Sequence, residues 1–127
     1  MAKLALVALG GGFGSVLRYV LAGWCQQLSK GSFPLGTLAV NVLGCLAIGA
    51  LKAAFTGSLL IKEEYQIALT IGLLGGFTTF SAFGWETFAL ANERDWPQAG
   101  LNLLLNVGLG LAAVLIGYRL AQKWYGV

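Results

Sequence analysis

Apolar residues fall into four long runs along the 127-residue chain, and short polar stretches separate the runs. The runs cover about residues 4–22, 34–55, 65–91 and 98–122. A helix that crosses a bilayer needs about 20 mostly apolar residues, so each run is long enough to cross a membrane once. The pattern therefore predicts an all-α integral membrane protein, with four transmembrane helices in a single domain over residues 1–127.

The third run places flexible and polar residues at its own middle, in the stretch GGFTTFSAFG over residues 75–84. The adjacent glycines Gly75 and Gly76 weaken a helix, and the threonines that follow can satisfy backbone groups exposed by a break. We therefore expect the third helix to be broken near its middle. A continuous helix with glycines at a helix crossing is the alternative. A break would free carbonyl oxygens, which suit a small hard cation.

Composition supports the membrane assignment and limits the chemistry. The chain is 57% hydrophobic and only 10% charged, whereas soluble domains are about 25% charged. The net charge of +3 comes from scattered lysines and arginines, so we expect no nucleic-acid partner. There is no histidine, and Cys25 and Cys45 lack a metal-ligand spacing. With no catalytic constellation in the sequence, we do not expect an enzyme.

The ends of the runs carry a weak charge bias. Lys3 and the apolar residues after it resemble a secretion signal, but Arg18 interrupts the run, so we expect a retained helix. Five basic residues fall toward one side, Lys3, Lys52, Lys62, Arg119 and Lys123, and three toward the other, Arg18, Lys30 and Arg94. So small a bias leaves insertion in both orientations possible, and with it an antiparallel homodimer. A single fixed orientation is the alternative.

Aromatic rings within the third run suggest an anion as the partner. Phe80 and Phe83 are three residues apart, so they share one face of a helix. Aromatic rings are positive at their edges, and ring edges that line a passage could replace part of the hydration shell of a small anion. Packing against other helices or lipid is the simpler alternative for this pair.

Polar side chains in the other runs could supply hydrogen-bond donors. Asn41 lies within the second run, and Asn102 and Asn106 lie one turn apart in the fourth. A buried amide must either bond across helices or face a pore. Arg18 and Glu86 are the deepest ionisable residues, although both lie toward the end of a run and could reach an interface.

Three of these segments together resemble the Fluc (CrcB-type) fluoride channel family. They are GGGFGSVLRY at residues 10–19, GTLAVNVLG at 36–44 and GGFTTFSAFGWE at 75–86. The resemblance covers essentially the whole chain. It implies a dual-topology antiparallel homodimer in the lipid bilayer of a bacterial inner membrane, with two pores through which fluoride leaves the cytoplasm passively. It also implies a structural sodium ion at the dimer centre.

The resemblance also implies roles for individual residues. The fluoride pore would be lined by Asn41, Phe80, Phe83, Thr79, Ser81 and Arg18, and the backbone carbonyls of Gly75 and Thr78 would hold sodium. The fourth run departs from the family, which has a hydroxyl-rich track there, because this chain has Asn102, Asn106, Gly108 and Gly110. The exit path of the ion is therefore not defined by the resemblance.

Two other functions fit part of the pattern. A small multidrug or cation antiporter also uses four short spans and dual topology, and Glu86 is the one candidate for its membrane carboxylate. A membrane scaffold that transports nothing would explain the glycines, but not the concentration of phenylalanine, threonine and asparagine.

Overall fold

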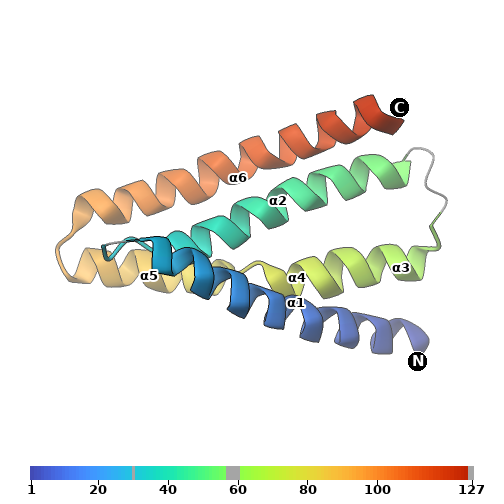
Figure 1. The fold of residues 1–127 in the computed structure, drawn as a ribbon, viewed down its shortest axis with the longest axis horizontal. Coiled ribbons are helices and arrows are strands. Elements are labelled where there is room, and N and C mark those ends of the chain that lie inside the picture. The colour runs from blue at the N-terminus through green and yellow to red at the C-terminus, as the bar shows by residue number, and fades with distance from the viewer. Residues whose placement is uncertain (30, 57–60, 126–127) are drawn as a thin grey trace.

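The computed structural model describes residues 1–29, 31–56 and 61–125. Its described residues form helices only: α1 (Ala2–Leu28), α2 (Leu35–Thr56), α3 (Glu63–Ile67), the π-helix η1 (Ala68–Leu74), α4 (Gly75–Phe77), α5 (Phe80–Asn92) and α6 (Trp96–Tyr125). The segments α3, η1, α4 and α5 follow one another along the third span (Figure 1). Four helical stretches are long and apolar enough to cross a membrane. The predicted four-span membrane protein with a broken third helix is confirmed.

The spans run past the apolar runs at most of their ends. The third span, for example, covers Glu63–Asn92 rather than residues 65–91. Apolar runs mark only the part of a helix that lies in hydrocarbon, whereas backbone hydrogen bonding continues into the polar flanks. Both ends of the chain lie at the same end of the bundle (Figure 1).

Close helix contacts depend on glycines, among them Gly10, Gly14, Gly72 and Gly76. Helix α1 packs along the third span, and α2 packs along α6 (Figure 1). A Cβ atom at Gly14 would overlap the carbonyl oxygen of Leu73, and one at Gly76 would overlap the backbone of α1. Small residues therefore let the backbones of α1 and the third span touch, as they do in tightly packed membrane helices.

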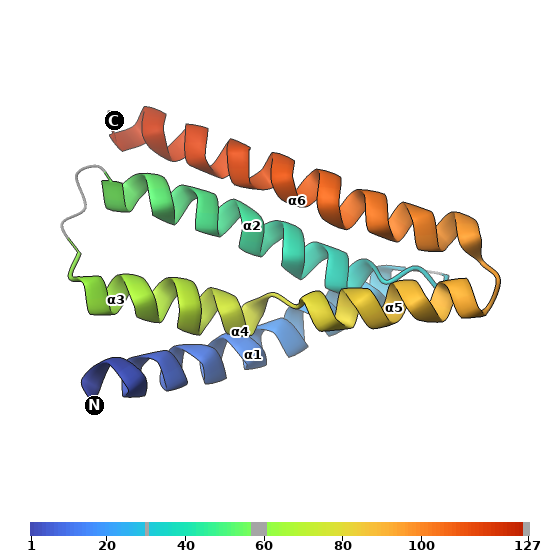
Figure 2. The same ribbon diagram turned by 180° about the vertical axis from the view of Figure 1, so that it is seen from behind.

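The break in the third span lies at Thr78 and Thr79, between α4 and α5 (Figure 2). Both residues are extended, with ψ 162° at Thr78 and φ −152° at Thr79. Gly75 and Gly76 stay helical, so the break is not at the glycines themselves. Gly76 is needed for contact with α1, and the two threonines provide the change of direction.

Each threonine of the break caps one helix. Thr78 donates from its amide and from Oγ1 to the Leu74 carbonyl oxygen, at 2.9 and 3.0 Å, which completes the last turn of α4. The Thr79 Oγ1 atom accepts from the Ala82 amide at 3.1 Å, which is the usual arrangement of an N-cap. The Thr79 hydroxyl thus replaces part of the backbone bonding that the break removes, whereas the Thr78 hydroxyl is a second donor to a carbonyl that keeps its helical bond.

Candidate functional site

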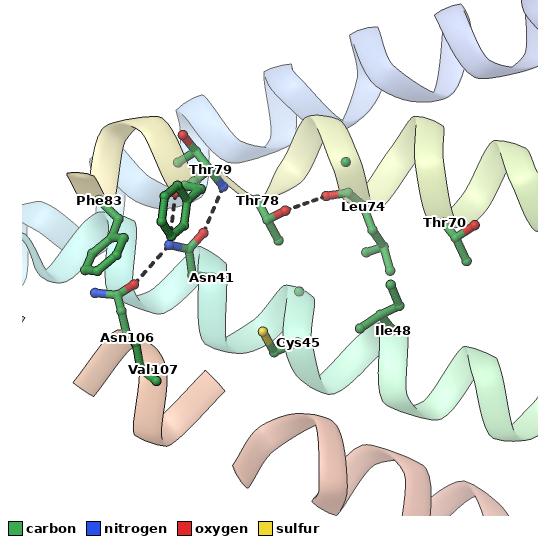
Figure 3. Close-up of a pocket in the computed structure, with 13 residues that line it drawn as sticks. Asn41, Cys45, Ile48, Thr70, Leu74, Thr78, Thr79, Phe83, Asn106 and Val107 are labelled. Atoms are coloured by element: carbon green, nitrogen blue, oxygen red, sulfur yellow. Dashed lines mark hydrogen bonds between the residues drawn. The ribbon is translucent and has the colours of Figure 1, made fainter. Parts of the chain in front are cut away.

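A cavity of about 390 Å³ lies beside the break. Its walls come from α2, from both halves of the third span and from α6 (Figure 3). The polar groups and rings that border it are Asn41, Thr70, Gly75, Thr78, Thr79, Phe80, Phe83 and Asn106. The structure therefore brings together six of the eight residues that the resemblance assigned to a pore or an ion. The other two, Arg18 and Ser81, lie next to the break rather than on the cavity wall.

Asn41 on α2 binds the extended backbone at Thr79. The Thr79 amide donates to Asn41 Oδ1 at 2.8 Å, and Asn41 Nδ2 donates to the Thr79 carbonyl oxygen at 3.1 Å. The same nitrogen also donates to Asn106 Oδ1 on α6 at 3.0 Å (Figure 3). An amide group offers two hydrogens, so both donors of Asn41 are bonded within the protein.

The break redirects the amides that would otherwise bond to two carbonyls. In an unbroken helix the Thr79 amide would donate to Gly75, and the Ala82 amide to Thr78. Here these amides donate to Asn41 Oδ1 and to Thr79 Oγ1 instead. The carbonyls of Gly75 and Thr78, which were predicted to hold sodium, have therefore both lost their helical donors. Carbonyl oxygens of this kind suit a hard cation. No group of three or more His, Cys, Asp or Glu side chains in the described residues could hold a metal ion.

Arg18 reaches the break from α1. Its guanidinium donates to the Thr78 carbonyl oxygen at 3.1 Å. A carbonyl oxygen has two lone pairs, so this bond leaves one for another partner. Because Arg18 lies at the depth of the break, it does not belong among the loop charges. Without Arg18, the tally is five basic residues toward one side of the membrane and two toward the other. One of those two, Lys30, lies outside the described residues.

The two phenylalanines contact each other but differ in burial. Their ring centroids are 5.4 Å apart, with ring planes at 65°, which is an edge-to-face arrangement. Phe83 is 5% exposed and Phe80 is 82% exposed. Nearby, Thr79 Oγ1 and Ser81 Oγ are 3.3 Å apart. Phe83 therefore lies inside the chain, whereas Phe80 points out of it.

A row of amides continues from the break into α6. Asn106 Nδ2 donates to the carbonyl oxygen and to Oδ1 of Asn102, at 3.1 and 2.9 Å. Asn102 is completely buried, and its Nδ2 donates to Thr87 Oγ1 at 2.9 Å. Sequence reasoning did not single out Thr87. Its position one turn after Phe83 could have indicated it, because α5 would then turn both side chains to one face.

Glu86 lies on α5, away from the break. Thr37 Oγ1 on α2 donates to Glu86 Oε1 at 2.6 Å. The other carboxyl oxygen, Oε2, is buried and has no hydrogen-bond partner among the described residues. Glu86 borders a second, smaller cavity of about 170 Å³ with Trp85 and Glu93. The carboxylate is therefore held between helices rather than extended to the interface.

Comparison with known proteins agrees with this arrangement. The family model described as "CrcB-like protein, Camphor Resistance (CrcB)" matches residues 5–118. A protein of Geobacter sulfurreducens named "Fluoride-specific ion channel FluC" is 42% identical over 123 residues, which are 97% of this chain and 99% of that protein. One of the same name from Solibacter usitatus is 44% identical over 121 residues, 95% of this chain and 99% of that protein.

The four spans and these bacterial relatives confirm the expectation of a multi-pass protein of a bacterial plasma membrane. The match of the family model covers most of the chain, and the relatives match it from end to end. The second and third motifs that carried the resemblance line the cavity, and Arg18 of the first motif bonds to the break at Thr78. The chain belongs to the CrcB-like family.

Proposed function

We propose that the chain is a fluoride-selective channel through which fluoride leaves the cytoplasm passively, and that it works as an antiparallel homodimer. The observation that carries the proposal is one cavity that joins a phenylalanine pair to uncharged amide and hydroxyl groups at a backbone break. Relatives that match nearly the whole chain bear the name of a fluoride-specific channel.

The chemistry of the cavity suits a small, strongly hydrated anion. Such an ion needs compact donors at close range to replace its water, and a fixed positive charge at the narrowest point would bind it too tightly to conduct. Ring edges of Phe80 and Phe83, the amide of Asn41 and the hydroxyls of Thr79 and Ser81 are uncharged groups of this kind. Arg18 would attract the anion toward the break without lining the cavity, because its guanidinium bonds to Thr78.

The surface around the break supports a second copy of the chain as its partner. Phe80 is 82% exposed, and the carbonyls of Gly75 and Thr78 border an open cavity. Non-helical backbone at membrane depth must be buried in protein or line a water-filled cavity rather than face lipid, and a second copy of the chain would keep lipid away from it. In an antiparallel pair the two breaks would meet at the bilayer midplane, and each Phe80 would lie against the partner.

A structural sodium ion is part of the proposal. The Gly75 and Thr78 carbonyls of two copies related by a two-fold axis would provide four oxygens. When bound, sodium would supply positive charge between carbonyl dipoles that otherwise repel one another. This chain's own contribution is to keep these oxygens free of helical donors, through Asn41 and the Thr79 hydroxyl.

Flux from liposomes tests the function. Vesicles loaded with potassium fluoride and containing purified protein should release fluoride when a potassium ionophore is added, and vesicles loaded with potassium chloride should not release chloride. Fluoride release no faster than from protein-free vesicles would refute the channel. Release that requires an opposing proton gradient would instead indicate an antiporter that uses Glu86. Replacement of all sodium by a large organic cation should abolish release and separate the dimer if sodium is structural.

A further inference from the structure

Hydrogen bonds in the row of amides all run in one direction. Starting at the break, Asn41 Nδ2 donates to Asn106 Oδ1, Asn106 Nδ2 to Asn102 Oδ1, and Asn102 Nδ2 to Thr87 Oγ1. The row ends where Thr87 Oγ1 donates to the Phe83 carbonyl oxygen at 2.8 Å. We call these four side chains, Asn41, Asn106, Asn102 and Thr87, the amide relay. Every link is between 2.8 and 3.0 Å long, so the bonds polarise one another in the same sense.

In this arrangement the relay has no donor left for an anion at the cavity. One hydrogen of Asn41 Nδ2 bonds to Thr79 and the other to Asn106. Asn106 presents its oxygen, not its nitrogen, on the side of Asn41. An anion that enters between these two residues would therefore meet an oxygen that repels it.

We infer that the amide relay reverses its direction when an anion occupies the cavity, an inference that rests on the proposed fluoride channel. The Asn106 and Asn102 amides each turn over, and the Thr87 hydroxyl rotates. Thr87 then donates to Asn102 Oδ1, Asn102 Nδ2 donates to Asn106 Oδ1, and Asn106 Nδ2 points to the cavity. The anion accepts one hydrogen from Asn41 and one from Asn106.

The reversal exchanges bonds, but it brings Asn106 Oδ1 to the Asn102 carbonyl oxygen that Nδ2 now contacts at 3.1 Å, and these two oxygens repel each other. Two links between side chains are remade in the opposite sense, and the anion replaces the Asn106 oxygen as the acceptor for Asn41. Two carbonyls, those of Phe83 and Asn102, lose a side-chain donor. Both lie inside helices, where the amide four residues later still donates to them. Without the anion, two NH₂ groups would face each other between Asn41 and Asn106, so the reversed direction is favoured only when an anion is present.

Thr87 lies at the end of the relay farthest from Asn41. It is not among the residues that line the cavity, so it acts only as a positioning residue, through Asn102. A hydroxyl can donate or accept by rotating, which makes Thr87 the end of the relay that permits either direction. Thr87→Val keeps the shape but removes this ability, and Thr87→Ser keeps it.

Nuclear magnetic resonance of the full chain in lipid nanodiscs gives the direct test. The sequence has four asparagines, Asn41, Asn92, Asn102 and Asn106, so asparagine-selective ¹⁵N labelling yields four side-chain NH₂ groups. Sodium fluoride, compared with sodium chloride at equal concentration, should shift the signals of Asn41, Asn106 and Asn102 together. Asn92 is exposed at the end of α5 and serves as the internal control.

Fluoride release from liposomes is measured in parallel. Thr87→Val removes one bond of Asn102 from each direction of the relay, so its release rate should stay within the roughly tenfold that one net hydrogen bond of about 1.4 kcal/mol represents. Thr87→Ser keeps both roles of the hydroxyl, so its release rate and its fluoride-dependent shifts should match those of the unchanged protein. Thermal unfolding of each variant shows whether the fold persists, and the spectra of the unchanged protein need no variant.

The outcomes separate the inference from the proposed function. If the unchanged protein releases fluoride but only the Asn41 signal moves, the reversal is wrong and the channel stands. If the unchanged protein releases no fluoride, the channel itself is wrong, and the reversal falls with it.

Discussion

Replacement of Asn41 by leucine removes the side chain that holds the break in the third span. Asn41 makes three hydrogen bonds there, two with the Thr79 backbone and one with Asn106. Leucine branches at Cγ as asparagine does but carries no polar atom, so the substitution removes all three bonds. The Thr79 amide and carbonyl then lose their partner on α2.

The expected cost follows from these three bonds. A typical intramolecular hydrogen bond contributes a net of about 1 kcal/mol, and a buried donor left without a partner costs about 1–3 kcal/mol. We therefore expect Asn41→Leu to lower the free energy of unfolding by about 3 kcal/mol. For a chain of this size, that loss lowers the midpoint of thermal unfolding by roughly 10 °C.

Thermal unfolding of the protein in mild detergent measures this effect, with Asn92→Leu as the matched control. Asn92 is exposed at the end of α5, so the same substitution there should leave the midpoint close to that of the unchanged protein. The reasoning is refuted if the midpoint of Asn41→Leu stays within about 2 °C of the control. In that case the two threonines would hold the break without help from α2.

Further predictions concern the rings, the helix contacts and the orientation. Phe80→Ile and Phe83→Ile should each reduce fluoride release while the dimer persists on size-exclusion chromatography, because isoleucine keeps apolar bulk but lacks a positive ring edge; unchanged release in both would rule out the ring-edge mechanism. Gly14→Val should destabilise the protein by more than the roughly 1–3 kcal/mol typical of overpacking, because its Cβ would overlap the Leu73 carbonyl. Gly12→Ala is the control: its Cβ meets open space, so its midpoint of thermal unfolding should stay near that of the unchanged protein. Extra lysines beside Lys62 should bias insertion toward one orientation and lower fluoride release. If a cysteine introduced into a loop is labelled from one side of the membrane only, while fluoride release is intact, the antiparallel dimer is excluded.

The four spans could be predicted from the sequence because hydrophobic length alone determines them. The break could be anticipated from the clustering of glycine and hydroxyl residues, but not its position. Which residues become extended depends on Asn41, which is 38 positions away from Thr79, and local propensity carries no information about such a partner. Of the two glycines that suggested the break, Gly76 turned out to be a contact point with α1.

The residues of the candidate site were easier to predict than the hydrogen bonds between them. Asn41, Phe80 and Phe83 stood out because polar and aromatic residues are conspicuous in an apolar span. The bond from Arg18 to Thr78 joins residues 60 positions apart, and the sequence left Arg18 either in the membrane or at an interface. Thr87 escaped notice because a hydroxyl in a helix more often bonds only to its own backbone, and its second bond depends on how α5 lies against α6.

The π-helix η1 has a consequence for how the third span can change in evolution. A π-turn closes its hydrogen bond over one residue more than an α-turn, so the seven residues of Ala68–Leu74 carry extra chain within the same stretch of span. Deletion of one of them could relax η1 to an α-helix without shortening the span much. The side chains after it would then keep nearly their present directions, because the deletion removes the residue that the π-turn holds in excess. The same deletion in an α-helical part of the span, such as α3, would rotate everything after it by about 100°, and Thr79 would turn away from Asn41. The π-helix is therefore the part of the third span in which the chain can lose a residue and keep the site.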